Sequence, residues 1–309
     1  MNNIQHHQMV KEAVQAKFRG NTTLHGKTTP MYPDSAEREF RRVTNGYMKL
    51  LNQTLKEHLP AMMAAYKRER RGDTRYDDAQ DLDAEIRQEL MKVAQELEQK
   101  LAAYGLYEMV EKIARLTKTT SLREWKRVVK ETLGIDLMDD YYKGDFYEQA
   151  LRMWVDSNVE KIKTIPTESL GSMRQIILDG YKQGRTIRDI SKDIQEEYNV
   201  SKHRAQMFAR DQVATLNAQI TKMQQQDAGC KRYRWSTSHD ARVRDCHRAL
   251  DGKIFNWNDP PEMWYETKKS GRVYTGRRCN PGEDYACRCV AIPVFDLDTI
   301  NVPMKEQED

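Results

Sequence analysis

Apolar side chains recur at helical spacing through most of the first 230 residues, and this pattern constrains the fold more than any other feature. One series is Phe40, Val43, Tyr47, Leu50, Leu51, Leu55, Leu59, Met62 and Tyr66, and the next is Leu82, Ile86, Leu90, Val93, Leu97, Leu101 and Tyr104. Steps of three and four residues place such side chains on one face of a helix. We therefore expect two long helices, packed as an antiparallel pair, with the first beginning after Asp34 or Ser35 and ending at Gly72.

Local start signals predict further helices up to Gly229. These signals are a capping-box pattern at Ser121 and Glu124, a helical pattern over 145–163, Pro166, Thr186 with Asp189, and Ser201. Each is expected to begin a separate helix.

The composition changes at Cys230. Residues 230–295 are rich in Gly, Pro, Trp and Cys, and short runs such as YRWSTS and CVAIPVF have the character of strands. The fold class predicted is α+β, mainly α, with an elongated helical N-terminal and middle region and a small C-terminal β-containing module. A module of this size needs either packing against the helices or a bound metal for stability.

These patterns divide the chain linearly. Residues 1–34 are expected to be a flexible tail, because 19–34 are polar and lack a period. Residues 35–164 form a helical region, and 165–295 form one domain, with helices over 165–229 and the Cys-containing β module over 230–295. Residues 296–309 are expected to be a solvated tail.

Composition also limits where the protein acts. No run of about 18 apolar residues predicts a membrane span, and the N-terminus lacks the apolar core of a secretion signal. We therefore expect a protein that acts in the cytoplasm in which it is made, without a membrane partner. The net charge is +4, but residues 231–292 hold 13 Lys or Arg against 8 Asp or Glu, a local net charge of +5. Such an excess attracts nucleic acid, or it is an ordinary solvated surface.

An ordered series of short motifs in residues 169–293 resembles the phage Mu F-like family of minor head or head morphogenesis proteins. The series consists of a G-x-x-x-G at 180–184, ARD at 209–211, AGCKRYRW at 228–235, HDARVRDCHRALDG at 239–252 and PGEDYACRCVAIPV at 281–294. The segment that contains them, residues 169–293, covers about 40% of the chain.

The resemblance implies a structural protein of a tailed bacteriophage and not an enzyme. Family members join the procapsid in few copies, bind the portal or its neighbourhood, and influence DNA packaging or ejection. We therefore expect a location in the virion, inside the head near the portal, after assembly in the host cytoplasm. The portal protein is the expected partner, with scaffold and major capsid proteins and double-stranded DNA as further candidates. Some relatives carry an enzyme or toxin module after this domain, and because only 16 residues follow Pro293 we expect none here.

Two cysteines separated by one residue suggest a metal site. On a strand, Cys287 and Cys289 would point to the same face, and paired thiolates hold zinc when further ligands are available. His247 is the best third ligand, and Asp284 or Cys279 is a candidate fourth. Family members often have C-x-x-C where this chain has Arg244 to His247, and His where it has Asp284, so the chain departs from that four-ligand pattern. The alternative is a set of buried thiols without metal.

Several other residues of the module are expected to hold its loops. Asp240, Arg242, Arg244, Asp251 and Arg288 form a candidate lattice of carboxylate–guanidinium pairs. Asp251 and Gly252 predict a tight hairpin turn, and Trp235 belongs to the same structural motif. A competing reading groups His239, Asp240 and His247 around a metal as a nuclease centre, but no complete catalytic constellation is visible.

DNA contact is a further hypothesis. Lys231, Arg232 and Arg234 alternate with Tyr233 and Trp235 and so combine cations with aromatic rings. The same alternation is also typical of a strand that buries its rings and exposes its charges.

Overall fold

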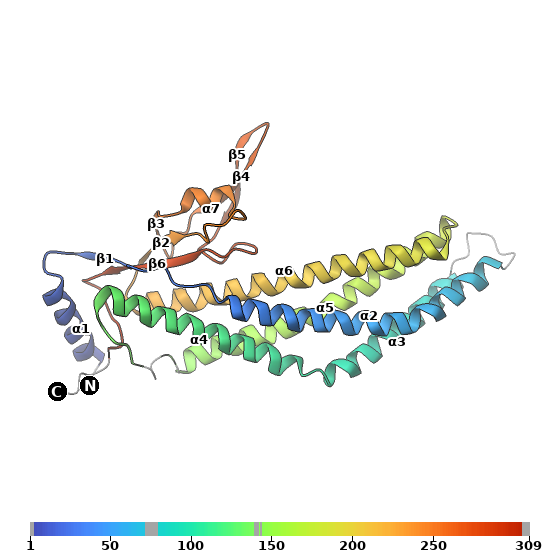
Figure 1. Cartoon of the computed structure of the whole chain (residues 1–309), viewed down its shortest axis with the longest axis horizontal. Coiled ribbons are helices and arrows are strands. Elements are labelled where there is room, and N and C mark those ends of the chain that lie inside the picture. Colours follow the sequence, from blue (N-terminus) through green and yellow to red (C-terminus); the bar gives the residue numbers. More distant parts are fainter. Residues whose placement is uncertain (1–2, 72–79, 139–141, 143, 305–309) are drawn as a thin grey trace. The chain divides into compact units, whose positions relative to one another are not determined.

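A computed structural model shows a mainly helical α+β chain with a four-stranded and a two-stranded antiparallel sheet, which confirms the predicted fold class (Figure 1). It describes residues 3–71, 80–138, 142 and 144–304. Its helices are α1 (Asn3–Lys17), α2 (Asp34–Arg71), α3 (Gln80–Ala102), α4 (Leu106–Leu133), α5 (Asp145–Lys182), α6 (Ile187–Asp227) and α7 (Asp245–Leu250). Its strands are β1 (Thr23–His25), β2 (Arg232–Ser236), β3 (Ile254–Asn256), β4 (Glu262–Thr267), β5 (Gly271–Arg278) and β6 (Val290–Asp296).

The two long helices expected from the two apolar series are confirmed as α2 and α3. Helix α2 begins at Asp34, and its first turn contains Asp34 and Glu37, whose negative charges favour a helix N-terminus. The expected stop at Gly72 lies outside the described residues.

Three of the predicted helix starts are wrong, because the helices there continue without a break. Ser121 lies inside α4, Pro166 inside α5 and Ser201 inside α6. The Ser121 hydroxyl donates to the Gln224 side chain at 3.2 Å, and the Ser201 hydroxyl bonds Glu197 one turn earlier at 3.2 Å. Buried packing along the helices therefore outweighs the local preference of these residues for helix ends.

The chain forms two compact units, each assembled from separated segments. Unit 1 comprises residues 1–37, 113–154 and 211–309, and unit 2 comprises 38–112 and 155–210. These units differ from the linear division predicted at residues 35, 165 and 296, because segments far apart in sequence pack into one core.

Unit 2 is helical and has its own apolar core. The core is built by α2, α3 and the portions of α5 and α6 inside this unit, with Met48, Leu51, Met62, Ile86, Val93, Met173 and Ile177 among its most buried side chains. Polar bridges join the helices. The Arg174 guanidinium donates to both carboxylate oxygens of Asp83 at 2.8 Å, and His58 lies between Glu89 and Glu96, at 3.2 and 2.9 Å.

Unit 1 contains the sheet, whose strand order is β1-β6-β2-β3 with all neighbours antiparallel. Strand β2 pairs with β6 over five residues, from Arg232 opposite Val294 to Ser236 opposite Val290. Strands β4 and β5 form a separate antiparallel hairpin. Strands β2 and β6 are thus the centre of the small C-terminal module.

The flexible tail expected at residues 1–34 is not what the structure shows for residues 3–34. Helix α1 buries Val10 and Val14, at 0 and 1% exposure, and β1 pairs with β6, where Leu24 lies opposite Phe295. The polar composition of this segment gave no indication of the helix or the strand. The hydrogen-bond partner of β1 lies about 270 residues away in the sequence, so the local sequence does not indicate the pairing.

The tail expected at 296–309 also belongs to the core over its described part. Leu297, Ile300 and Val302 are all buried and pack in the same apolar cluster as Val10, Val14 and Phe295. The first and last segments of the chain therefore stabilise unit 1 together.

Candidate metal centre

His247 is positioned by the short helix α7 and by the sheet beside it. The residue before the helix, Arg244, is extended, and the helix buries Cys246, His247 and Leu250. The Trp235 ring from β2 meets the imidazole edge to face, with 5.5 Å between ring centroids. His247 therefore has a fixed ring plane and only 3% exposure.

The two thiols are brought together by a tight turn that precedes β6. Ala286 has a positive φ of 49°, which is unfavourable for a residue with a Cβ, and its N–H donates to the Asp211 carboxylate at 2.9 Å. The Cys289 N–H donates to the Cys287 sulfur at 3.3 Å. Both thiols face His247, but the prediction that a strand places them there is wrong, because β6 begins only at Val290 and the turn before it brings the thiols together.

A close approach to α6 fixes this loop further. Gly282 has a φ of +87°, and a Cβ there would lie 2.9 Å from the Cβ of Ala218. Only glycine fits this conformation and this spacing. Gly282 and Asp211 therefore anchor to α6 the loop that precedes the cysteine pair.

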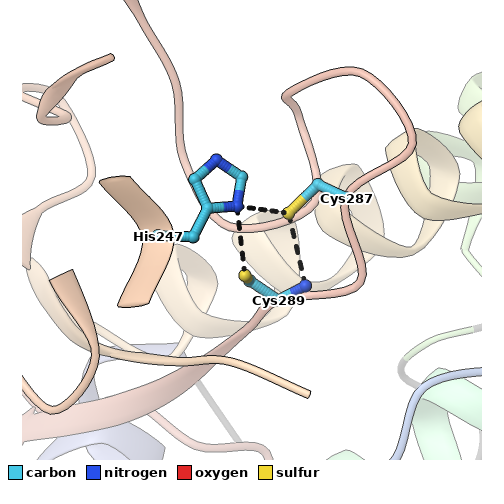
Figure 2. Close-up of side chains that lie close together, drawn as sticks. All are labelled: His247, Cys287 and Cys289. Atoms are coloured by element: carbon cyan, nitrogen blue, oxygen red, sulfur yellow. Dashed lines mark hydrogen bonds between the residues drawn. The ribbon is translucent and has the colours of Figure 1, made fainter. Parts of the chain in front are cut away.

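The imidazole and the two sulfurs converge (Figure 2). The Nδ1 atom of His247 lies 3.6 Å from the Cys287 sulfur and 3.5 Å from the Cys289 sulfur. The three ligating atoms lie within 4.8 Å of one another, and all three residues are buried. The predicted association of His247 with the paired thiols is thus what the structure shows.

Asp284 occupies the opposite side of the imidazole. Its Oδ2 accepts hydrogen bonds from His247 Nε2 at 3.1 Å and from Arg244 at 2.8 Å, and its Oδ1 accepts one from Arg277 at 3.1 Å. Asp284 is therefore not among the atoms that converge with the sulfurs, and neither is Cys279. The structure places Asp284 as the partner of the second imidazole nitrogen.

Neighbouring groups shift the pKa values of Asp284, His247 and Cys287 in different directions. Burial alone would raise the pKa of Asp284, but the hydrogen bond from His247 and the charge of Arg244 bring this pKa to about 2. Burial lowers the pKa of His247, yet hydrogen bonds to Asp284 and Cys287 outweigh it and raise the pKa to about 9. Hydrogen bonding from Cys289, against the effect of burial, lowers the pKa of the Cys287 thiol.

The expected lattice of carboxylates and guanidinium groups exists with different partners. Asp240 accepts from Arg242 at 2.7 Å, and Arg244 bonds Asp284. Arg288 does not pair with Asp251, because it forms two hydrogen bonds to the buried Glu37, at 2.7 and 3.1 Å.

Asp251 and Gly252 fix the turn after α7. The Asp251 carboxylate accepts from the Thr237 N–H at 2.8 Å, and Gly252 has a φ of +74°. The expected turn is therefore present, but it joins α7 to β3 and does not connect two strands of a hairpin. Trp235 is buried at 1% exposure, as a structural role requires.

The residues proposed for a nuclease centre do not meet. His239 contacts Thr237 at 3.3 Å, and Asp240 pairs with Arg242. Within the described part of the chain, the metal-ligating side chains grouped with His247 are Cys287 and Cys289 alone. The geometry thus favours a thiol–imidazole site over a carboxylate–imidazole one.

The aromatic residues that alternate with the basic residues expected to contact DNA are buried in the core. Tyr233 and Trp235 are buried at 0 and 1% exposure, so neither ring is available to stack on bases. Lys231 is exposed, whereas Arg234 donates to the backbone oxygen of Gly26 at 3.2 Å. Alternation in β2 is therefore ordinary strand amphipathicity.

The hairpin β4–β5 is a charged and aromatic surface that the sequence reading missed. Tyr265 and Tyr274 are 54 and 59% exposed, and Lys268 and Lys269 lie exposed at its turn. The run KKSG between two aromatic stretches was the available signal for it.

The fold and the site define a helical protein with a small module in which a helix-borne histidine meets a C-x-C pair. Residues 172–292 match the family described as Phage Mu protein F like protein. The resemblance drawn from the motifs is thereby confirmed: this segment is similar to the phage Mu F-like family.

Comparison with whole proteins adds one relative. The chain is 30% identical over 184 residues to an uncharacterized protein of Haemophilus influenzae, an alignment that covers 59% of this chain and 38% of the relative. The chain thus spans well under half of that protein's length. No solved structure matches the chain, and no described helix combines the length and apolar character that crossing a bilayer requires.

Proposed function

We propose that this chain is a minor head protein of a tailed bacteriophage, which binds the portal and acts in procapsid assembly, DNA packaging or DNA ejection. The observation that carries the proposal is the similarity of residues 172–292 to the phage Mu F-like family. Its residence would be the virion, inside the head near the portal, after assembly in the host cytoplasm. Scaffold and major capsid proteins are further candidate partners.

The role proposed is structural and not catalytic. The buried polar residues of the module are used to hold its loops, as in the pairs Arg288–Glu37 and Thr237–Asp251. Long helices of 38 to 41 residues, namely α2, α5 and α6, provide extended surfaces for protein partners.

Co-expression with the portal protein of the same phage tests the proposal. The full chain should co-purify with the assembled portal through size-exclusion chromatography and should remain bound at physiological salt. The portal of an unrelated phage is the control. Elution of the chain separately from its own portal, at concentrations where both are folded, would argue against portal binding.

We propose DNA contact by the β4–β5 hairpin as a second function, compatible with the first. Residues 262–278 carry five Lys or Arg and two Asp or Glu, a net charge of +3. Figure 1 shows the hairpin extending from the module beyond α7. A two-stranded ribbon fits the major groove of double-stranded DNA, whose width is about 12 Å.

Side-chain contacts and strand pairing hold the hairpin together. Arg272 lies over the Trp264 ring, 4.2 Å from its centroid, and Trp264 pairs with Tyr274 across the strands. Lys268 and Lys269 at the turn are the cations best placed to meet phosphate.

Binding of the full chain to a mixed-sequence DNA duplex, followed by fluorescence anisotropy at several salt concentrations, tests this function. The double variant Lys268→Ala/Lys269→Ala should reduce the slope of log affinity against log salt by about 2, because each lost phosphate contact contributes about 0.9. The exposed pair Lys49→Ala/Lys56→Ala in unit 2 is the matched control. An equal effect of both double variants, or no binding at low salt, would exclude the hairpin contact.

A further inference from the structure

We propose that His247, Cys287 and Cys289 bind one thiophilic divalent metal ion, with Zn²⁺ as the physiological choice, and that Asp284 orients the imidazole without touching the metal. The proposal rests on the positions of these four side chains and does not depend on the role of the chain in a phage head.

The spacing of the three ligating atoms fits a tetrahedral ion. Zinc lies about 2.3 Å from sulfur and about 2.05 Å from imidazole nitrogen, so at a tetrahedral angle the nitrogen and sulfur are about 3.6 Å apart. The two observed distances from His247 Nδ1 are 3.6 Å to Cys287 and 3.5 Å to Cys289. The two sulfurs in such a site lie about 3.8 Å apart, which agrees with three ligating atoms that are all within 4.8 Å of one another.

The imidazole presents the correct nitrogen to the sulfurs (Figure 2). A ligating histidine usually donates its other N–H to a carboxylate, which fixes the tautomer and the ring plane. His247 Nε2 lies 3.1 Å from Asp284, so the neutral ring that metal binding requires would carry its lone pair on Nδ1, which faces both thiols. Arg244 and Arg277 hold the carboxylate in place through hydrogen bonds of 2.8 and 3.1 Å.

Without a metal, the imidazole can form a hydrogen bond with only one sulfur at a time. One ring nitrogen offers a single site, either one N–H or one lone pair, and two sulfurs compete for it at nearly equal distances. A metal ion that all three atoms share removes this competition. The N–H of Cys289, which points to the Cys287 sulfur at 3.3 Å, also stabilises a sulfur that carries negative charge.

The surroundings are suited to a thiophilic ion. The three ligands are buried at 3 to 5% exposure, among the apolar side chains of Trp235, Cys246 and Leu250. Soft thiolates and imidazole select zinc over magnesium or calcium. Within the described residues no fourth Cys, His, Asp or Glu joins the group, so the fourth position of the tetrahedron would be open to a water molecule.

Metal content of the full chain, purified in reductant without a polyhistidine tag and dialysed, gives the first test. The wild type should retain about one zinc ion per chain, and Cys287→Ser/Cys289→Ser should retain none. The control is Cys279→Ser, which removes a cysteine outside the group and should leave the zinc content unchanged. Zinc retention by the double cysteine variant equal to that of wild type would overturn the proposal.

A second pair of measurements keeps the test independent of how the variants fold. In the wild type, zinc X-ray absorption should show two sulfur neighbours at about 2.3 Å and nitrogen or oxygen neighbours at about 2.0 to 2.1 Å. A first shell of oxygen or nitrogen alone would refute the site. Asp284→Asn should still bind one ion but with affinity lower by 10- to 100-fold, and complete loss of the sulfur-bound ion in this variant would make Asp284 a ligand.

Discussion

Replacement of Phe295 by alanine tests whether the two ends of the described chain form one core. Phe295 has 0% exposure and lies in the cluster that contains Val10, Val14 and Val302. Its ring stacks on Trp125, with 6.0 Å between centroids. The substitution removes a fully buried ring that several separate segments surround, so the cavity cannot close easily, and we expect a loss of about 4 kcal/mol.

Tryptophan fluorescence is a specific assay for this change. All five tryptophans of the chain, at 125, 154, 235, 257 and 264, lie in unit 1. Unfolding by urea, followed by fluorescence, therefore reports on unit 1, whereas far-ultraviolet circular dichroism reports on the helices of both units. With a slope of about 2 kcal/mol per molar urea, the fluorescence midpoint of Phe295→Ala should fall by about 2 M.

A matched control uses another phenylalanine of the same unit. Phe146 is 68% exposed, so Phe146→Ala should change the stability by no more than about 0.5 kcal/mol. If Phe295→Ala unfolded at the same urea concentration as Phe146→Ala, the terminal segments would not pack around Phe295, and the interpretation of unit 1 would be refuted.

Two other predictions concern a titrating bridge and a pair of glycines. Hydrogen bonding to Glu96, which exceeds the opposing effect of burial, raises the pKa of His58 above 6.5, with a further contribution from Glu89. The stabilisation by protonated His58 is thus complete below pH 6.5 and is lost as the pH rises through the raised pKa. The melting temperature, monitored by circular dichroism, should therefore depend on pH in this range in the wild type, and His58→Gln should lose this dependence. An unchanged dependence would contradict the bridge. Gly229→Ala should cost about 3 kcal/mol by tryptophan fluorescence, because the residue has a φ of +80° and its new Cβ would lie 1.8 Å from a backbone oxygen. Gly252→Ala, with a φ of +74° and nothing within 4 Å, should cost only about 1 kcal/mol, and equal costs would argue against the close contact.

Periodic patterns predicted the helices whose apolar face can be read from neighbouring residues in the sequence. Helices α2 and α3 follow directly from the spacing of residues such as Leu51 and Ile86. The predicted helix starts at Ser121 and Ser201 were wrong, because both residues find side-chain partners inside long helices. A start signal reflects the local preference of a residue, whereas packing with the rest of the chain decides whether a helix begins there.

Non-local pairing accounts for most of what could not be predicted. Strand β1 has only three residues, and its place in the sheet depends on β6 near the other end of the chain. The partner of Arg288 is Glu37, which lies 251 positions away in sequence. Neither composition nor periodicity carries information on such distant contacts.

The candidate site was predicted in part. A C-x-C pair and a nearby histidine are chemically distinctive, so His247, Cys287 and Cys289 could be grouped from sequence alone. The side of the imidazole on which Asp284 lies depends on the turn at Ala286 and on the arginines that surround the carboxylate. Only the three-dimensional arrangement separates a metal ligand from a residue that orients one.

Quantitative mass spectrometry of purified phage heads tests the central claim most directly. Heads assembled by a phage that encodes this chain should contain it in a fixed and small ratio to the portal protein, and heads that lack the portal should contain none. Its absence from complete heads, with the protein abundant and folded in the same lysate, would contradict a role as a minor head protein.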